Sequence, residues 1–122
     1  MMKILVVDDS NLSRRTMRGI LESQGYQIIE AQDGMTAIER YFLEKPDLVM
    51  LDIVMTGMQG LEVLEKLRKL DNQARIIIAT ADLQTFTHQL AMEAGAVGVV
   101  NKPFTTTAVL TVVNNVLQGV QQ

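Results

Sequence analysis

Short runs of consecutive apolar residues recur along this chain, and each is followed by a longer stretch with helical periodicity. A strand that is apolar without alternation is buried on both faces, which is typical of a parallel sheet covered by helices on its two sides. Four such runs are Ile4–Val7, Leu48–Leu51, Ile76–Ala79 and Ala96–Val100. A fifth, more polar run, Tyr26–Ala31, is expected to form an edge strand.

Helical patterns follow all five runs, over residues 11–24, 35–44, 60–71, 84–94 and 105–118. The helix over 60–71 is the most distinct: its leucines share one face, and Glu62–Lys66 and Glu65–Lys69 are expected to pair on the other. Five successive strand–helix units with right-handed crossovers predict an α/β fold, a (βα)5 doubly wound, five-stranded parallel sheet.

Length and composition narrow the functional class. A chain of 122 residues, 48% hydrophobic, is expected to fold as one domain over residues 1–122. Its formal charge of -3 means that it has no excess of basic residues, which nucleic-acid-binding proteins typically have. The chain has no cysteine, which suits a reducing compartment, and no apolar stretch long enough for a bilayer. We therefore expect a soluble, cytoplasmic protein that is not inserted in a membrane.

Polar and charged residues stand where the predicted strands end. Asp8 and Asp9 follow the first run, Asp52 follows the third, Thr80 ends the fourth, and Lys102 follows the fifth. In a doubly wound sheet, ligands bind outside the carboxyl ends of the strands. These five side chains are therefore expected to meet at one rim.

Carboxylates gathered at such a rim call for a cation. Two of them ~4 Å apart repel by ~4 kcal/mol at an effective dielectric constant of about 20. Asp9 and Asp52, with Asp8 directly or through water, suit Mg²⁺, which prefers carboxylates, waters and phosphate oxygens. An ionised Asp is then a plausible nucleophile toward phosphorus, with Lys102 and Thr80 on the other phosphoryl oxygens.

Five segments in order carry a family resemblance: ILVVDDS (4–10), DLVMLDIVM (47–55), IIIATA (76–81), EAGA (93–96) and NKPF (101–104). The sequence resembles the receiver domain of two-component response regulators, and within that family the single-domain chemotaxis receivers. The resemblance implies the flavodoxin-like (CheY-like) strand order 2-1-3-4-5.

The resemblance also implies residue roles. Asp52 resembles the phosphoacceptor, Asp8 and Asp9 the magnesium-binding pair, Thr80 the switch hydroxyl, and Lys102 the lysine that pairs with the phosphoryl group, usually before a cis proline. The donor would be a histidine kinase or a histidine phosphotransfer protein. The output would be a protein target on the face of the fourth helix, fifth strand and fifth helix. The implied protein is a monomer or weak dimer, a signalling switch that slowly dephosphorylates itself rather than an enzyme.

Several positions depart from the family pattern. Val99 stands where the family often has an aromatic residue, so the switch is expected to be carried by the loop before the fourth helix, with Phe86. Val54 and Asp82 flank the site at positions that set phosphoryl lifetime, with opposing expected effects. Thr56 replaces a common proline, which is expected to free its loop.

Other interpretations stay open at this point. One is a receiver module from a response regulator with a DNA-binding or enzymatic output domain. Another is a degenerate receiver that binds partners constitutively. A phosphatase with an Asp nucleophile is disfavoured, because Val54 stands where such enzymes often place a general acid. Arg14, Arg15 and Arg18 are read as either a solvated face or a docking patch for an acidic kinase domain.

Overall fold

The computed structural model of the protein describes residues 2–55, 57–81 and 85–119. Strands and helices alternate along the described chain. The strands are β1 (Lys3–Val7), β2 (Gln27–Ala31), β3 (Leu48–Leu51), β4 (Ile76–Thr80) and β5 (Gly98–Asn101). The helices are α1 (Asn11–Glu22), α2 (Gly34–Glu44), α3 (Gly60–Leu70), α4 (Thr85–Glu93) and α5 (Thr106–Leu117).

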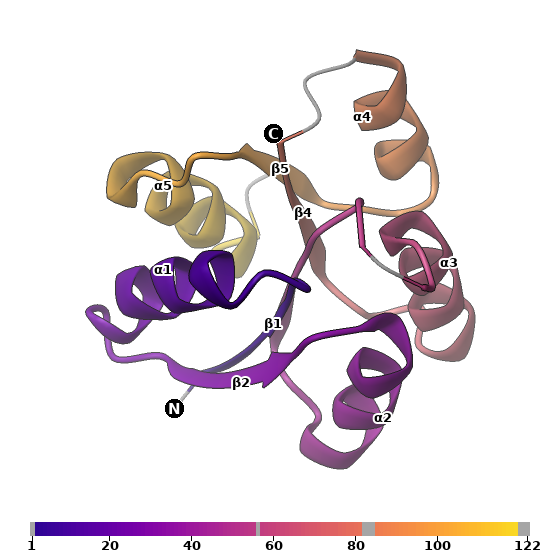
Figure 1. Ribbon diagram of the computed structural model, residues 1–122, viewed down its shortest axis with the longest axis horizontal. Helices are drawn as coiled ribbons and strands as arrows, with labels where there is room; N and C mark the ends of the chain where they lie inside the picture. The colour runs from indigo at the N-terminus through magenta and orange to yellow at the C-terminus, as the bar shows by residue number, and fades with distance from the viewer. Residues whose placement is uncertain (1, 56, 82–84, 120–122) are drawn as a thin grey trace.

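All strand pairings are parallel, and the sheet has the order β2-β1-β3-β4-β5. Helices α1 and α5 cover one face of the sheet, and α2, α3 and α4 cover the other (Figure 1). The predicted doubly wound fold, its strand order and the edge position of β2 are confirmed.

The apolar runs are continuous because each strand feeds two cores. In β1, Leu5 and Val7 pack into the core under α2, α3 and α4, whereas Ile4 and Val6 pack into the core under α1 and α5. All four of these side chains are at most 3% exposed. Burial on both faces contributes roughly 1.5–3 kcal/mol for each large apolar side chain, so the register of a central strand is strongly specified.

Local sequence accounts for the ends of the helices. Ser10 caps α1, since its side chain accepts a hydrogen bond from Ser13 N at 3.2 Å. Asp33 caps α2 in the same way from Thr36 N at 2.8 Å. The fifth strand begins at Gly98 rather than at Ala96. Helix α5 lies so close to Gly98 that a Cβ added there would stand 2.8 Å from Val112 Cγ1.

One local expectation is wrong. None of the ion pairs within 4 Å between described residues includes Glu62, Glu65, Lys66 or Lys69. All four side chains lie on the exposed face of α3. The physical reason is that an exposed ion pair gains little over hydration and costs side-chain entropy.

Among the described residues, no helix is both long enough and apolar enough to cross a membrane.

Candidate functional site

The sheet itself fixes the backbone of the candidate site. Asp8 N donates to Ala31 O of β2 at 3.2 Å, and Asp52 N donates to Val7 O of β1 at 3.0 Å. Lys102 N donates to Thr80 O of β4 at 2.8 Å. Asp8, Asp52 and Lys102 are therefore each held by one more backbone hydrogen bond of the parallel sheet, just beyond the end of a strand.

A single ammonium group joins two buried carboxylates at this rim. Lys102 Nζ lies 2.8 Å from Asp8 Oδ2 and 3.0 Å from Asp52 Oδ2. Asp8 is 3% exposed and Asp52 is 4% exposed. Their other oxygens accept backbone hydrogen bonds, Asp8 Oδ1 from Ser10 N and Asp52 Oδ1 from Val54 N. The site is thus a preorganised charge cluster in which the lysine offsets carboxylate repulsion.

Burial dominates the protonation equilibrium of the central carboxyl group. It raises the pKa of Asp52 above its usual range, against the opposing effect of the Lys102 ammonium, and the neighbouring Asp8 carboxylate adds to the rise. Burial alone would lower the pKa of Lys102, but hydrogen bonds to Asp8 and Asp52 outweigh it and raise that pKa. The lysine therefore stays charged beside the two acids.

The acidic residues also fit a divalent cation. Asp8, Asp9 and Asp52 each offer a carboxylate oxygen, and the three atoms lie within 4.8 Å of one another. Asp9 is exposed while the other two are buried, so the group opens to solvent on one side. Hard oxygen donors with an open side match the preference of Mg²⁺, which keeps several waters.

Thr80 belongs to the same rim but is fully buried, at 0% exposed, at the end of β4. The five predicted site residues therefore all lie at the carboxyl ends of β1, β3, β4 and β5. The Lys102–Pro103 peptide bond is cis, as the family resemblance implied.

The expected modulating positions have different outcomes. Val54 is 61% exposed, and its backbone N–H donates to Asp52 Oδ1 at 3.1 Å. Val99 lies inside β5 opposite Ile78 and packs against the core under α2, α3 and α4. Asp82, Thr56 and the Phe86 side chain lie outside the described residues.

Two residues have supporting roles that the sequence reasoning did not assign. Gly60 N donates to Ile53 O at 2.8 Å, and a Cβ on Gly60 would stand 2.1 Å from Asp52 O. A glycine at the start of a strongly amphipathic helix, eight residues after the candidate nucleophile, was the available signal. Only a glycine lets α3 begin this close to the end of β3.

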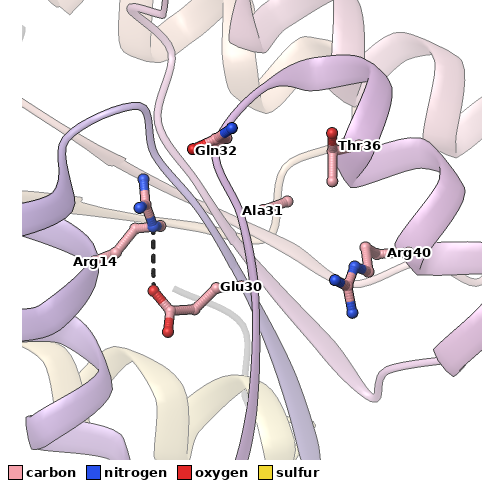
Figure 2. Close-up of a pocket in the computed structure, with 6 residues that line it drawn as sticks. All are labelled: Arg14, Glu30, Ala31, Gln32, Thr36 and Arg40. Carbon is pink, nitrogen blue, oxygen red and sulfur yellow. Dashed lines mark hydrogen bonds and ion pairs between the residues drawn. The ribbon is translucent and has the colours of Figure 1, made fainter.

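Arg14 was expected on a solvated or docking face, and the structure gives it contacts inside the protein. Its Nη1 donates to Asp8 O at 2.6 Å, and its Nε lies 3.1 Å from Glu30 Oε1 on the edge strand (Figure 2). Arg18 bonds the other oxygen of Glu30. The two arginines thus bind α1 to β2 rather than forming only a solvated face. Their spacing of four residues places both arginines on one helix face, but no sequence pattern identified Glu30 of the edge strand as their partner.

Comparison with known proteins identifies related sequences. The family model described as the response regulator receiver domain matches residues 4–114. Chemotaxis protein CheY of Bacillus subtilis is 38% identical over 116 residues, which cover 94% of this chain and 97% of that protein. Sporulation initiation phosphotransferase F of the same organism is 37% identical over 102 residues, covering 84% and 82% of the two chains.

A solved structure has the same architecture. The CheX–CheY–BeF3–Mg complex from Borrelia burgdorferi contains a chain that matches with a TM-score of 0.92 at 31% identity. The match covers 95% of this chain and 89% of that one.

Proposed function

This chain belongs to the response regulator receiver family, and we propose that it is a single-domain switch that accepts a phosphoryl group on Asp52. Receivers of this family are signalling proteins of two-component systems. The observation that carries the proposal is the Lys102 ammonium bound to both Asp8 and Asp52 at the acidic rim. This arrangement places the proposed nucleophile, the Asp52 carboxylate, beside a fixed positive charge.

The proposed transfer is a displacement at phosphorus. An oxygen of the Asp52 carboxylate forms the new O–P bond while the P–N bond of a phosphohistidine breaks, and the imidazole leaves with the electron pair. Lys102 then exchanges its bond to Asp52 for one to a phosphoryl oxygen, and Thr80 serves a second oxygen. Slow attack of water on the phosphorus of the acyl phosphate releases inorganic phosphate and returns the Asp52 carboxylate.

Asp8, Asp9 and Asp52 would hold a Mg²⁺ ion, which supplies positive charge for the phosphoryl oxygens when bound. The backbone N–H groups of Ser10 and Val54 keep the Asp8 and Asp52 carboxylates oriented toward that position. These bonds are made before any ligand arrives, so little reorganisation is needed.

We propose that the signal is received from one protein and passed to another by direct binding. A histidine kinase or a histidine phosphotransfer protein is the donor, and the target binds the face of α4, β5 and α5, where Leu90 and Met92 are 37% and 43% exposed. Phosphorylation must raise affinity for that target, because a switch shifts only by differential binding. We propose a cytoplasmic monomer or weak dimer without direct nucleic-acid contact.

Switching and lifetime extend the proposal to the residues around Thr80. With Val99 in place of an aromatic residue, the loop between β4 and α4 is proposed to carry the conformational change, together with Phe86 of α4. Amide hydrogen exchange on α4 and β5 should differ with and without beryllofluoride; equal exchange contradicts this route. Val54 shields the acyl phosphate from water and Asp82 orients water, so Asp82→Ala should change the dephosphorylation rate.

Intact-protein mass spectrometry tests the central step. The wild-type chain and Asp52→Asn are incubated with acetyl phosphate in Mg²⁺ or in EDTA, beside a known receiver as a positive control. We expect a phosphoryl adduct in wild-type protein with Mg²⁺ only. Absence of the adduct while the control is labelled would favour a constitutive binding module, and labelling of Asp52→Asn would move the acceptor elsewhere.

A further inference from the structure

Helices α2 and α3 lie on the sheet face opposite α1 and α5 (Figure 1). Side chains from both helices and from the loop before α3 line an apolar groove. It encloses about 360 Å³ and is lined by Met35, Ile38, Met58, Lys66, Lys69 and Leu70. Neither the acidic rim nor the face of α4, β5 and α5 contributes to it. The proposed phosphoryl chemistry therefore leaves this groove unused.

The floor of the groove is already packed. A Cβ added to Gly34 would stand 2.9 Å from Met58 Cβ and 2.7 Å from Val63 Cγ2, so the start of α2 rests directly on the loop before α3. A preformed floor lowers the ordering cost that a partner must overcome.

Two large apolar side chains at the edges of the groove are exposed to solvent. Met35 is 68% exposed and Leu70 is 61% exposed. Single exposed apolar residues are common, but several around one concave site are typical of a binding surface. Ile38 lies one turn after Met35 on α2, so the apolar strip runs along the helix.

The charge at the groove has one sign. Lys66 and Lys69 are its only charged lining residues, and neither has an ion pair within 4 Å among described residues. Face-to-face contact of two copies would bring both pairs of lysines together, which opposes self-association. The apolar floor beside these ammonium groups is therefore complementary to a partner surface with an apolar ridge bordered by carboxylates.

We propose that this groove docks an acidic amphipathic helix of a partner protein. Apolar residues at i, i+3, i+4 and i+7 of that helix fill the space over Met35, Met58 and Leu70. Its glutamates or aspartates face Lys66 and Lys69. The concave shape between two helices suits a helical ridge better than a flat anionic membrane surface.

Methionine-methyl NMR provides a direct test, because the chain places methionines inside and outside the groove. The protein, labelled with ¹³C at the methionine methyl groups, is titrated with a synthetic helical peptide that has leucines on one face and glutamates on the other. We expect the Met35 and Met58 signals to shift, while Met92 on α4 and the buried Met17 stay in place. A peptide with lysines in place of the glutamates should bind more weakly.

Matched variants separate the groove from general electrostatics. Lys69→Glu should weaken binding of the acidic peptide by roughly two- to fivefold, the range for an exposed charge pair. Arg15→Glu makes the same charge change on α1, at an exposed residue without an ion pair among those described, and should leave affinity unchanged. Leu70→Asn, at an exposed position, should weaken binding without unfolding the chain.

Three outcomes would overturn the proposal. The Met92 signal alone could move, which would place the peptide on α4. Arg15→Glu could weaken binding as much as Lys69→Glu, which would make the attraction non-specific. Anionic phosphatidylglycerol vesicles could shift Met35 and Met58 where the acidic peptide does not, which would assign the surface to lipid. None of these readouts depends on phosphorylation of Asp52.

Discussion

Lys102 is the residue on which the electrostatics of the acidic rim depends. Its ammonium lies within 3.0 Å of an oxygen of both Asp8 and Asp52, whose side chains are almost fully buried. A buried charge that loses its partner costs far more than the pair contributes. Lys102 is therefore expected to stabilise the folded state even when no ligand is bound.

Replacing this lysine should expose that cost. We expect Lys102→Met to lower the free energy of unfolding by about 1–3 kcal/mol at pH 7 in EDTA, because two buried carboxylates then face each other without a cation. Mg²⁺ should restore part of the loss. Urea denaturation measures both effects, with Lys66→Met as the exposed control, expected within about 0.5 kcal/mol of wild type. Equal losses in the two variants would contradict this account.

Glu30 gives a second residue-scale prediction, on pH. Burial alone would raise the pKa of Glu30, but hydrogen bonds from Arg18 and Arg14 outweigh it and hold the pKa below its ordinary value of 4.5. A lowered folded-state pKa stabilises the fold above pH 4.5, and this contribution is lost as pH falls through the folded-state pKa. Glu30→Gln should therefore cost roughly 0.5–1 kcal/mol at pH 7 and little at low pH.

A pH series of urea denaturation curves checks that prediction. Glu39→Gln is the matched control, since Glu39 is exposed on α2 and has no ion pair among the described residues. A constant difference between Glu30→Gln and wild type from neutral to acidic pH would show that packing, not charge, is lost.

At the scale of elements, the start of α3 is packed directly against the backbone that follows β3. The first residue of this helix, Gly60, bonds Ile53 O and has backbone atoms of Asp52 and Ile53 where a Cβ would stand. Backbone cannot give way as a flexible side chain can. The distance between α3 and the end of β3 is thus set by the absence of one methyl group.

Two glycine substitutions test this contrast. Gly60→Ala should destabilise the fold by roughly 2–4 kcal/mol, because its Cβ would meet Asp52 O at 2.1 Å. Gly19→Ala in α1, where nothing lies within 4 Å of the added Cβ, should stabilise the fold by roughly 0.5–1 kcal/mol. Thermal and urea unfolding distinguish the two. A neutral Gly60→Ala would mean that α3 shifts freely relative to β3.

The elements were predictable from sequence because burial sets their periodicity. Continuous apolar runs identified four buried strands, and residues just beyond strand ends identified Asp8, Asp9, Asp52, Thr80 and Lys102. Long-range side-chain geometry left no such pattern. The Arg14–Glu30 pair spans 16 residues, and Lys66 and Lys69 of α3 have no acidic partner within 4 Å among the residues that the structure describes. Rotamer choice at a half-exposed surface depends on neighbours that periodicity does not identify.

At the scale of the whole molecule, the candidate site draws on separate parts of the chain. Its acidic residues follow β1 and β3, two adjacent central strands, and its lysine follows the edge strand β5. The sheet brings together residues that are far apart in sequence, so unfolding disperses the site completely. Any ion that binds this site must therefore stabilise the entire fold.

Magnesium should accordingly raise the stability of the protein as a whole. At a free concentration ten times its dissociation constant, Mg²⁺ should add about 1.4 kcal/mol to the free energy of unfolding, and thermal unfolding should shift upward with its concentration. Asp9→Asn should abolish most of this shift, because it removes one of three clustered carboxylates while leaving the buried pair and Lys102 in place. Glu65→Gln removes a carboxylate from the exposed face of α3 and should keep the full response. If Asp9→Asn responds like Glu65→Gln, the ion acts on general surface charge, and the acidic rim is not where it binds.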